Sequence, residues 1–140
     1  MSTGPRVPAL ALHHVGILVD DFDVIRTVFG HLLGCEVGDP EPQPHLGVDI
    51  LWVTVNGVRL EFVRSVNPES DAASEVAAGR GGVHHVAVEV TNVDNALSEL
   101  GAAGLALLDQ VSRPGHDHHP IGFVDPASVD GVLLELVERT

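Results

Sequence analysis

Residues 12–19 read LHHVGILV and residues 83–90 read VHHVAVEV, so a His-His pair opens an apolar, β-branched run twice in this chain. A repeat of this kind indicates that two similar modules carry equivalent residues at equivalent places. Each run is typical of a β-strand. If the two modules pack as a pair, one imidazole from each can meet in a common site.

The order of elements that follows is the same in both halves. In the first half, apolar spacing and turn residues predict a helix over 22–33, a short strand over 35–37, a loop over 38–44, and strands over 48–55 and 58–63 joined by Asn56-Gly57. In the second half they predict a helix over 93–103, a short strand over 105–108, a loop over 110–119, and strands over 121–124 and 132–137. Each half therefore has the order β-α-β-β-β.

The predicted fold class is α+β. Two tandem βαβββ modules, about 10–64 and 83–138, would form one curved eight-stranded sheet around a metal-binding cleft, with the helices outside. A connector over 65–82 joins them, with a short helix near 71–78, and the whole chain of 140 residues would be a single domain. An ordinary α+β sandwich without cleft chemistry is the alternative that the repeat leaves open.

The composition excludes several functions. The formal net charge is −13, and all seven cationic residues are arginine, which argues against nucleic acid or an anionic membrane as a partner. Without lysine the chain has no Schiff-base or P-loop lysine, and its single cysteine forms no disulfide framework. The sequence has no apolar stretch of membrane-spanning length and no signal peptide, so we expect a cytoplasmic protein.

Strand alternation assigns the histidines to different faces. His14 shares a face with Gly16, and His85 shares one with Ala87, whereas His13 and its apolar neighbours suit the face that packs on the helix. The pattern therefore predicts that His14 and His85 point toward the opposite side of the sheet, next to small residues.

The last strand of each module carries a glutamate among apolar residues, Glu61 in the first module and Glu135 in the second. An ionised carboxylate in a buried strand costs several kcal/mol unless it is paired or coordinated. Counting back from the Asn56-Gly57 turn pairs Trp52 with Glu61, so Trp52 is expected to line the same site.

Two histidines and two glutamates form a plausible set of ligands for one divalent metal ion, and Co, Zn, Ni, Mn and Fe all accept such nitrogen and oxygen donors. Taken singly, each residue has an ordinary alternative, because a strand histidine is more often a core or surface residue and a strand glutamate more often faces water. The recurrence of the whole set in both modules favours the metal site.

Several motifs together resemble the vicinal oxygen chelate superfamily, and most closely its methylmalonyl-CoA epimerase branch. The resemblance covers about residues 12–138 and rests on the stretches 14–17 (HVGI), 58–61 (VRLE), 83–87 (VHHVA), 113–115 (RPG), 123–126 (FVDP) and 131–138 (GVLLELVE). It implies that His14, Glu61, His85 and Glu135 ligate the metal. It also implies that Glu135 moves a proton, and that an opposing base stands at the position of His45, where the epimerases have a glutamate.

We therefore expect a metal-dependent epimerase or isomerase that removes and returns a proton next to a carbonyl. The substrate would be a small molecule such as an acyl-CoA thioester, and Trp52, Arg113 and His116 are the residues expected to bind it. The resemblance also implies a homodimer. The histidine-rich loop over 116–119 is interpreted mainly as a solvated loop, with a lid over the substrate and a second metal site as alternatives.

Three other functions remain open from the sequence. The first is a glyoxalase I-like lyase or isomerase, or a specialised biosynthetic isomerase with a less charged substrate. The second is an extradiol-type dioxygenase, which needs Fe(II), two histidines and one glutamate. The third is a non-catalytic protein that sequesters a small molecule, as drug-binding members of the superfamily do without the metal ligands.

Overall fold

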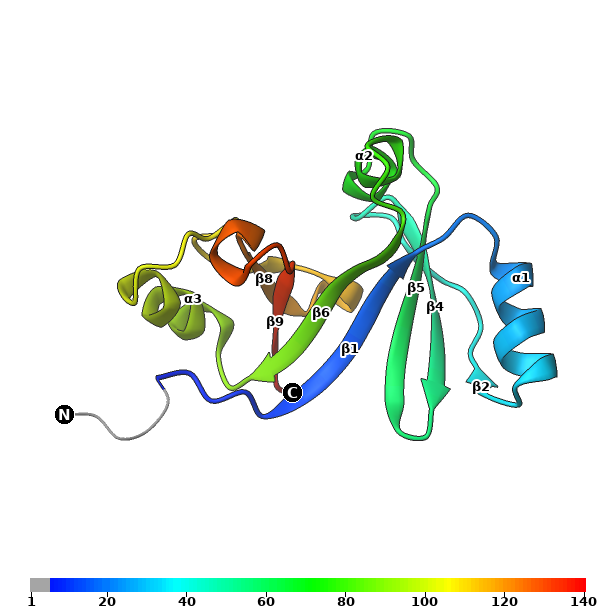
Figure 1. The fold of residues 1–140 in the computed structure, drawn as a ribbon, viewed down its shortest axis with the longest axis horizontal. Helices are drawn as coiled ribbons and strands as arrows, with labels where there is room; N and C mark the ends of the chain where they lie inside the picture. The colour runs from blue at the N-terminus through cyan, green and yellow to red at the C-terminus, as the bar shows by residue number, and fades with distance from the viewer. Residues whose placement is uncertain (1–5) are drawn as a thin grey trace. The chain divides into compact units, whose positions relative to one another are not determined.

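The computed structural model describes residues 6–140 of the chain. Its contacts divide the chain into two compact units, drawn in Figure 1. The first unit is His14–His84, and the second contains residues 6–13 and those from His85 onward. Strands β1 (Ala11–Leu18) and β6 (Gly82–Val90) therefore each contribute residues to both units. The boundaries fall inside the two His-His pairs.

In the first unit the strands lie in the order β2-β4-β5-β1, and β3 pairs with β4. The strands that follow β1 are β2 (Glu36–Val37), β3 (Glu41–Gln43), β4 (Val48–Val55) and β5 (Val58–Ser65). Helix α1 (Phe22–Ile25) begins at the capping carboxylate of Asp21 and continues as a π-helical segment, η1 (Arg26–Leu32). Helix α2 (Asp71–Ala77) begins at Ser70.

The hairpin between β4 and β5 has the register that its turn predicts. Asn56 and Gly57 have φ angles of 47° and 85°, the positive values that a two-residue turn of this kind requires. Val55 then pairs with Val58, and Trp52 pairs with Glu61. The predicted Trp52–Glu61 pairing is therefore confirmed.

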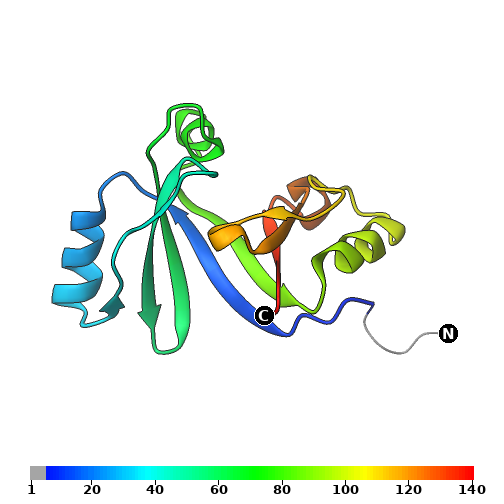
Figure 2. The ribbon, with the colours of Figure 1, turned by 180° about the vertical axis from the view of Figure 1, so that it is seen from behind.

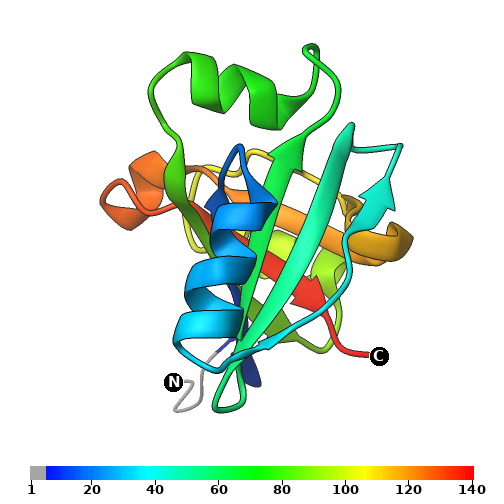
Figure 3. The ribbon, with the colours of Figure 1, turned by 90° about the vertical axis from the view of Figure 1, so that its right-hand side faces the viewer.

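Strand β4 is buried on both of its faces. On one face Leu51 and Val53 pack with Phe22 of α1 and with Phe62, and Figure 3 shows α1 in front of this hairpin. On the other face Val48, Ile50 and Trp52 pack with Leu18 of β1. Because Ile17 and Val19 join the helix-side cluster, alternation puts His14, Gly16 and Leu18 on the side away from the helix, as predicted.

In the second unit the strands lie in the order β6-β9-β8-β7. The elements after β6 are α3 (Val93–Ala102), β7 (Arg113–Pro114), the 3₁₀ segments η2 (His116–His118) and η3 (Pro126–Val129), β8 (Pro120–Val124) and β9 (Leu134–Glu138). Leu97 of α3 packs with Val90 and Leu136, and α3 lies beside these strands in Figure 2. A Cβ at Gly122 would lie 2.8 Å from Leu97, so a glycine on β8 allows this close approach.

The predicted α+β class is confirmed, since each unit contains parallel and antiparallel strand pairs with few helices. Each unit contains the expected order of one strand, a helix and further strands. Residues 6–140 contain nine strands instead of eight, and none of their helices is long and apolar enough to span a membrane.

Four local predictions differ from the structure. The loop over 38–44 contains β3, whose single proline, Pro42, is tolerated because β3 pairs with β4 alone. The short strand over 105–108 is reduced to one bridge, Leu107–Val124, because Leu108 and Asp109 both donate to the Phe123 carbonyl. The helix over 22–33 changes to π-helical bonding at Arg26, and the loop over 110–119 contains β7 and η2.

Candidate functional site

A buried histidine and a buried glutamate form a pair in the first unit. His14 on β1 is 3% exposed and Glu61 on β5 is 7% exposed. The parallel pairing of Gly16 with Glu61 places the glutamate beside the histidine strand. The His14 Nε2 atom lies 3.6 Å from the Glu61 Oε1 atom. A carboxylate and an imidazole this close offset part of each other's desolvation cost.

Trp52 contacts this pair from the neighbouring strand. It pairs with Glu61 across the β4–β5 hairpin, and its ring meets the His14 ring edge-on, with centroids 5.4 Å apart. Trp52 is itself 7% exposed. We call His14, Glu61 and Trp52 the first half-site.

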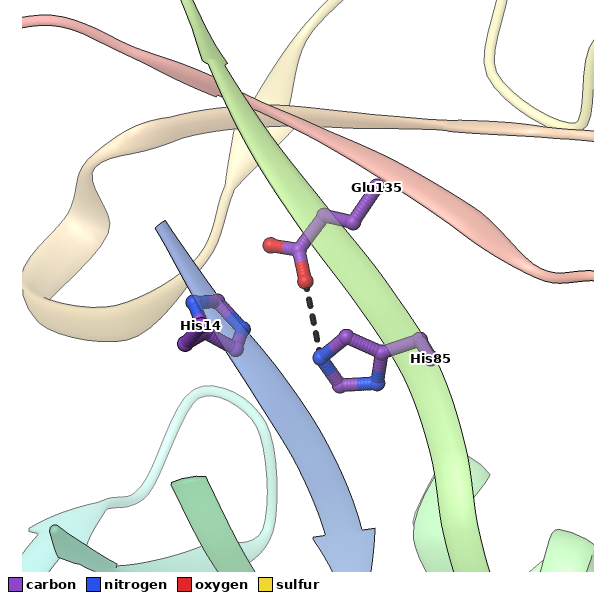
Figure 4. A group of neighbouring side chains, drawn as sticks. All are labelled: His14, His85 and Glu135. Carbon is purple, nitrogen blue, oxygen red and sulfur yellow. Dashed lines mark ion pairs between the residues drawn. The ribbon is translucent and has the colours of Figure 1, made fainter. Parts of the chain in front are cut away.

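The second unit contains an equivalent group. The His85 Nε2 atom on β6 lies 2.9 Å from the Glu135 Oε1 atom on β9, the ion pair drawn as a dashed line in Figure 4. Ala87 pairs with Glu135 as Gly16 pairs with Glu61. Phe123 on β8 pairs with Glu135 and meets the His85 ring edge-on at 5.8 Å. We call His85, Glu135 and Phe123 the second half-site.

The two half-sites are built by the same strand geometry. In each, a histidine stands two residues before a small residue that pairs with a buried glutamate, and that glutamate pairs on its other side with an aromatic residue. The sequence predicted Trp52 but missed Phe123. No two-residue turn joins β8 to β9, since residues 125–133 lie between them, so no turn in the sequence fixes the register that pairs Phe123 with Glu135.

Each half-site offers one imidazole nitrogen and one carboxylate from rigid strands. These donors suit a borderline divalent ion, which imidazole and carboxylate ligands bind well. A pair of buried ionisable side chains on an otherwise apolar face is also more costly than an apolar pair, so a functional reason for keeping it is expected. The chemistry of the donors therefore fits the metal ion that the sequence implies.

His45 lies in the turn between β3 and β4, and its side chain is exposed. The turn is held by two backbone bonds, from Leu46 N to the Gln43 carbonyl and from Gly47 N to the Pro44 carbonyl. Gly47 has a φ of 68°, and a Cβ there would lie 3.0 Å from Asn67. The backbone two residues after His45 therefore needs a glycine, because a side chain at Gly47 would be both strained and crowded.

Arg113 and His116 lie near each other in the chain, on β7 and at the start of η2. The Arg113 Nε atom is 3.2 Å from a carboxylate oxygen of Asp109, and its guanidinium lies over the Phe123 ring at 5.1 Å. Arg113 thus contacts the aromatic residue of the second half-site.

The segment around His116 has an unusual backbone. Asp117 and His118 have positive φ angles of 51° and 62°. A Cβ on Gly115 would lie 2.8 Å from the Ile121 side chain, so this buried position suits only glycine. The histidine-rich segment is therefore a kinked turn in which two successive residues have left-handed backbone angles, which are uncommon outside glycine.

The first histidine of each His-His pair is less buried than the second. His13 and His84 are both half-buried, whereas His14 and His85 are buried. The His84 Nε2 atom lies 3.7 Å from Glu75 Oε2 on α2, and Glu75 also binds Arg80. The hydrogen bond from Arg80 lowers the pKa of Glu75 below its ordinary value.

Comparison with known proteins identifies the family. Residues 13–123 match the model of the glyoxalase/bleomycin resistance protein/dioxygenase superfamily. The chain belongs to this superfamily. It is 32% identical over 126 residues to the mitochondrial methylmalonyl-CoA epimerase of Bos taurus, a match that covers 89% of this chain and 72% of the bovine protein.

Solved structures agree with this assignment. The methylmalonyl-CoA epimerase of Mycobacterium tuberculosis superimposes with a TM-score of 0.84 at 26% identity, over 100% of this chain and 93% of that one. A methylmalonyl-CoA epimerase in complex with methylmalonyl-CoA and ammonium gives a TM-score of 0.81 at 26% identity, over 92% and 94% of the two chains. These relatives confirm the prediction of an enzyme of the isomerase type. They do not favour the glyoxalase, dioxygenase or binding-protein alternatives.

Proposed function

We propose that the protein is an epimerase that exchanges the proton on the carbon next to a thioester carbonyl, with methylmalonyl-CoA or a closely related α-substituted acyl-CoA as substrate. The observation that carries this proposal is the recurrence of a buried histidine, a buried glutamate and an edge-on aromatic ring in both units. The similarity to epimerases over nearly the whole chain supports the same reaction.

His14, Glu61, His85 and Glu135 are proposed to bind one divalent metal ion, so that each half-site supplies one nitrogen and one oxygen ligand. Their buried positions and mixed donors suit this role. When bound, the ion would stabilise the negative charge that develops on the substrate oxygen as the proton leaves. Co, Zn, Ni, Mn and Fe all remain compatible with these four ligands.

Epimerisation needs two groups that move a proton, because the proton leaves one face of the reacting carbon and returns to the other. We assign these roles to Glu135 and His45. A histidine can serve as acid or base near neutral pH. The resemblance implies a glutamate at this position, so His45 would give the site one negative charge fewer than that pattern has. Trp52, Arg113 and His116 are assigned to binding the substrate.

The proposal extends to a cytoplasmic enzyme that works as a homodimer. Both half-sites are on one chain, so dimer formation is not needed to supply a ligand. Light scattering of the purified protein at several concentrations tests the dimer separately from the reaction.

The test is uptake of solvent deuterium into methylmalonyl-CoA, followed by mass spectrometry with metal-loaded enzyme. We expect uptake with wild-type protein and its loss in Glu135→Gln. His45→Gln should slow exchange from one face of the substrate while metal content is unchanged. Glu99→Gln, which removes a carboxylate on α3, is the matched control and should exchange normally. If wild-type protein with a full complement of metal exchanges no proton with any α-substituted acyl-CoA, the proposed function is wrong.

A further inference from the structure

The arginines of the chain are mostly engaged with carboxylates of the protein itself. The ion pairs are Arg64–Asp49, Arg80–Glu75, Arg113–Asp109 and Arg139–Glu89. Arg26 instead donates to the Gly38 carbonyl. The Arg59 guanidinium lies over the Trp52 ring at 3.8 Å from the centroid. Arg64 and Arg113 also lie over aromatic rings, but each of them is paired with a carboxylate as well. Within residues 6–140, no carboxylate is paired with Arg59.

The register of the hairpin explains where Arg59 lies. Arg59 and Glu61 are two residues apart on β5, so their side chains share a face, and Trp52 shares that face because it pairs with Glu61. Arg59 is thus the diagonal neighbour of Trp52, close enough for a long side chain to cover the ring. Two residues along a strand span about 6.8 Å. The Arg59 backbone therefore lies two residues along β5 from Glu61, and its positive charge is on the same face as the first half-site.

Stacking on the indole prepares this guanidinium to bind an anion. The ring face attracts the cation and fixes its plane. The N–H groups lie in that plane and point outward from its edge, so stacking leaves them available as donors to a carboxylate or phosphate. Arg59 is half-buried, and a partly desolvated cation binds an anion more strongly than one in free solution.

We propose that Arg59 binds the free carboxylate of an α-carboxyacyl thioester, and so selects substrates that carry this group. This inference rests on the proposed function, because it takes the first half-site as the place where the acyl group binds. In such a substrate the carboxylate is attached to the reacting carbon itself. The phosphates of CoA lie at the far end of the pantetheine arm. A cation one strand repeat from Glu61 is therefore better placed for the carboxylate than for a phosphate.

Binding measurements test the assignment independently of turnover. Isothermal titration would compare methylmalonyl-CoA with propionyl-CoA, which differ only in the carboxylate, on wild type, Arg59→Met and Arg59→Lys. We expect Arg59→Met to weaken methylmalonyl-CoA binding about ten- to a hundredfold, the usual effect of losing a charged hydrogen bond, and to leave propionyl-CoA binding unchanged. Arg59→Lys should keep part of the preference. Arg139→Met removes the same charge from the Glu89 pair and should keep all of it.

A third ligand, methylmalonyl-pantetheine, separates the two possible sources of the anion, because it retains the carboxylate and lacks the nucleotide phosphates. Arg59→Met should weaken its binding as much as that of methylmalonyl-CoA. An equal loss for both CoA thioesters, with methylmalonyl-pantetheine unaffected, would assign Arg59 to a phosphate and overturn the proposal. Wild-type protein that binds the three ligands equally, or none of them, would overturn it too. A carboxylate preference that depends on Arg59, in a protein that exchanges no deuterium, would support the binding role while refuting the reaction.

Discussion

The indole of Trp52 contacts both a histidine and an arginine: its plane makes an angle of 82° with the His14 ring in a T-shaped contact, and the Arg59 guanidinium lies over its face. The ring also packs with Leu18, Val48, Ile50 and Val63 in the core of the first unit. One side chain therefore fixes a proposed ligand, orients a cation and fills the core. Substitution of Trp52 should affect stability and ligand binding together.

Replacing Trp52 by alanine should lower the free energy of unfolding by about 3–5 kcal/mol, because a large buried ring is removed from a packed cluster. Trp52→Phe should cost much less, since it retains an aromatic ring for the contacts with His14 and Arg59. Urea unfolding followed by circular dichroism measures both. Val66→Ala, at an exposed position, is the control and should change stability little. A loss below about 1 kcal/mol in Trp52→Ala would show that the cluster repacks around the missing ring.

The two histidines of each pair should behave differently toward metal. His14→Ala and His85→Ala each remove a proposed ligand, so their affinity for the ion should fall more than a hundredfold, beyond the effect typical of an outer-shell change of about 10–100-fold. His13→Ala and His84→Ala should retain wild-type metal stoichiometry and lose only some stability. Elemental analysis after dialysis against a metal buffer gives the stoichiometry. If His13→Ala loses the ion with its fold intact, the ligand assignment on β1 is shifted by one residue.

Most of the architecture could be predicted because the sequence contains its periods and turn residues directly. The twin His-His runs became β1 and β6, and Asn56-Gly57 fixed the register that pairs Trp52 with Glu61. Alternation also correctly separated His14 from the helix-packed face. These features are local, so they can be counted along the chain.

The features that could not be predicted depend on contacts with distant residues. Strand β3 exists because β4 offers it a partner, in spite of the prolines that indicate a loop. The expected strand over 105–108 is shortened to one bridge because the Phe123 carbonyl accepts two N–H groups there. The stacking of Arg59 on Trp52 could not be predicted, because the sequence does not show which diagonal neighbours in a hairpin are in contact. The ligand roles of His14, Glu61, His85 and Glu135 stay predictions until metal is measured.

The approach of Gly115 to Ile121 should make this glycine essential for the structure of the histidine-rich turn. A Cβ at Gly115 would lie 2.8 Å from two carbons of Ile121, so Gly115→Ala should cost about 1–3 kcal/mol through overpacking. The double variant Gly115→Ala with Ile121→Val removes one methyl from the crowded side chain and should recover part of the loss. Gly81→Ala, where a Cβ would meet open space, is the matched control in thermal melting. Equal melting temperatures for Gly115→Ala and Gly81→Ala would contradict the close approach.

The ion pair of Glu75 with Arg80 should contribute to stability only where the carboxylate is ionised. The hydrogen bond from Arg80 lowers the pKa of Glu75 from its ordinary value of 4.5. A carboxyl whose pKa is lower in the folded protein stabilises the fold above its unfolded pKa, and this contribution is lost as the pH falls through the folded pKa.

Glu75→Gln should therefore melt at a lower temperature than wild type at pH 7. The difference should be only a few degrees, because a partly exposed ion pair is screened by solvent and salt. The difference should shrink as the pH is lowered below 4.5. Glu69→Gln removes the same charge from an exposed residue just before α2 and should show no such pH-dependent difference. Melting curves at several pH values, at low and high salt, give the comparison. A deficit in Glu75→Gln that is as large in acid as at neutral pH would mean that the side chain acts through packing and not through its charge.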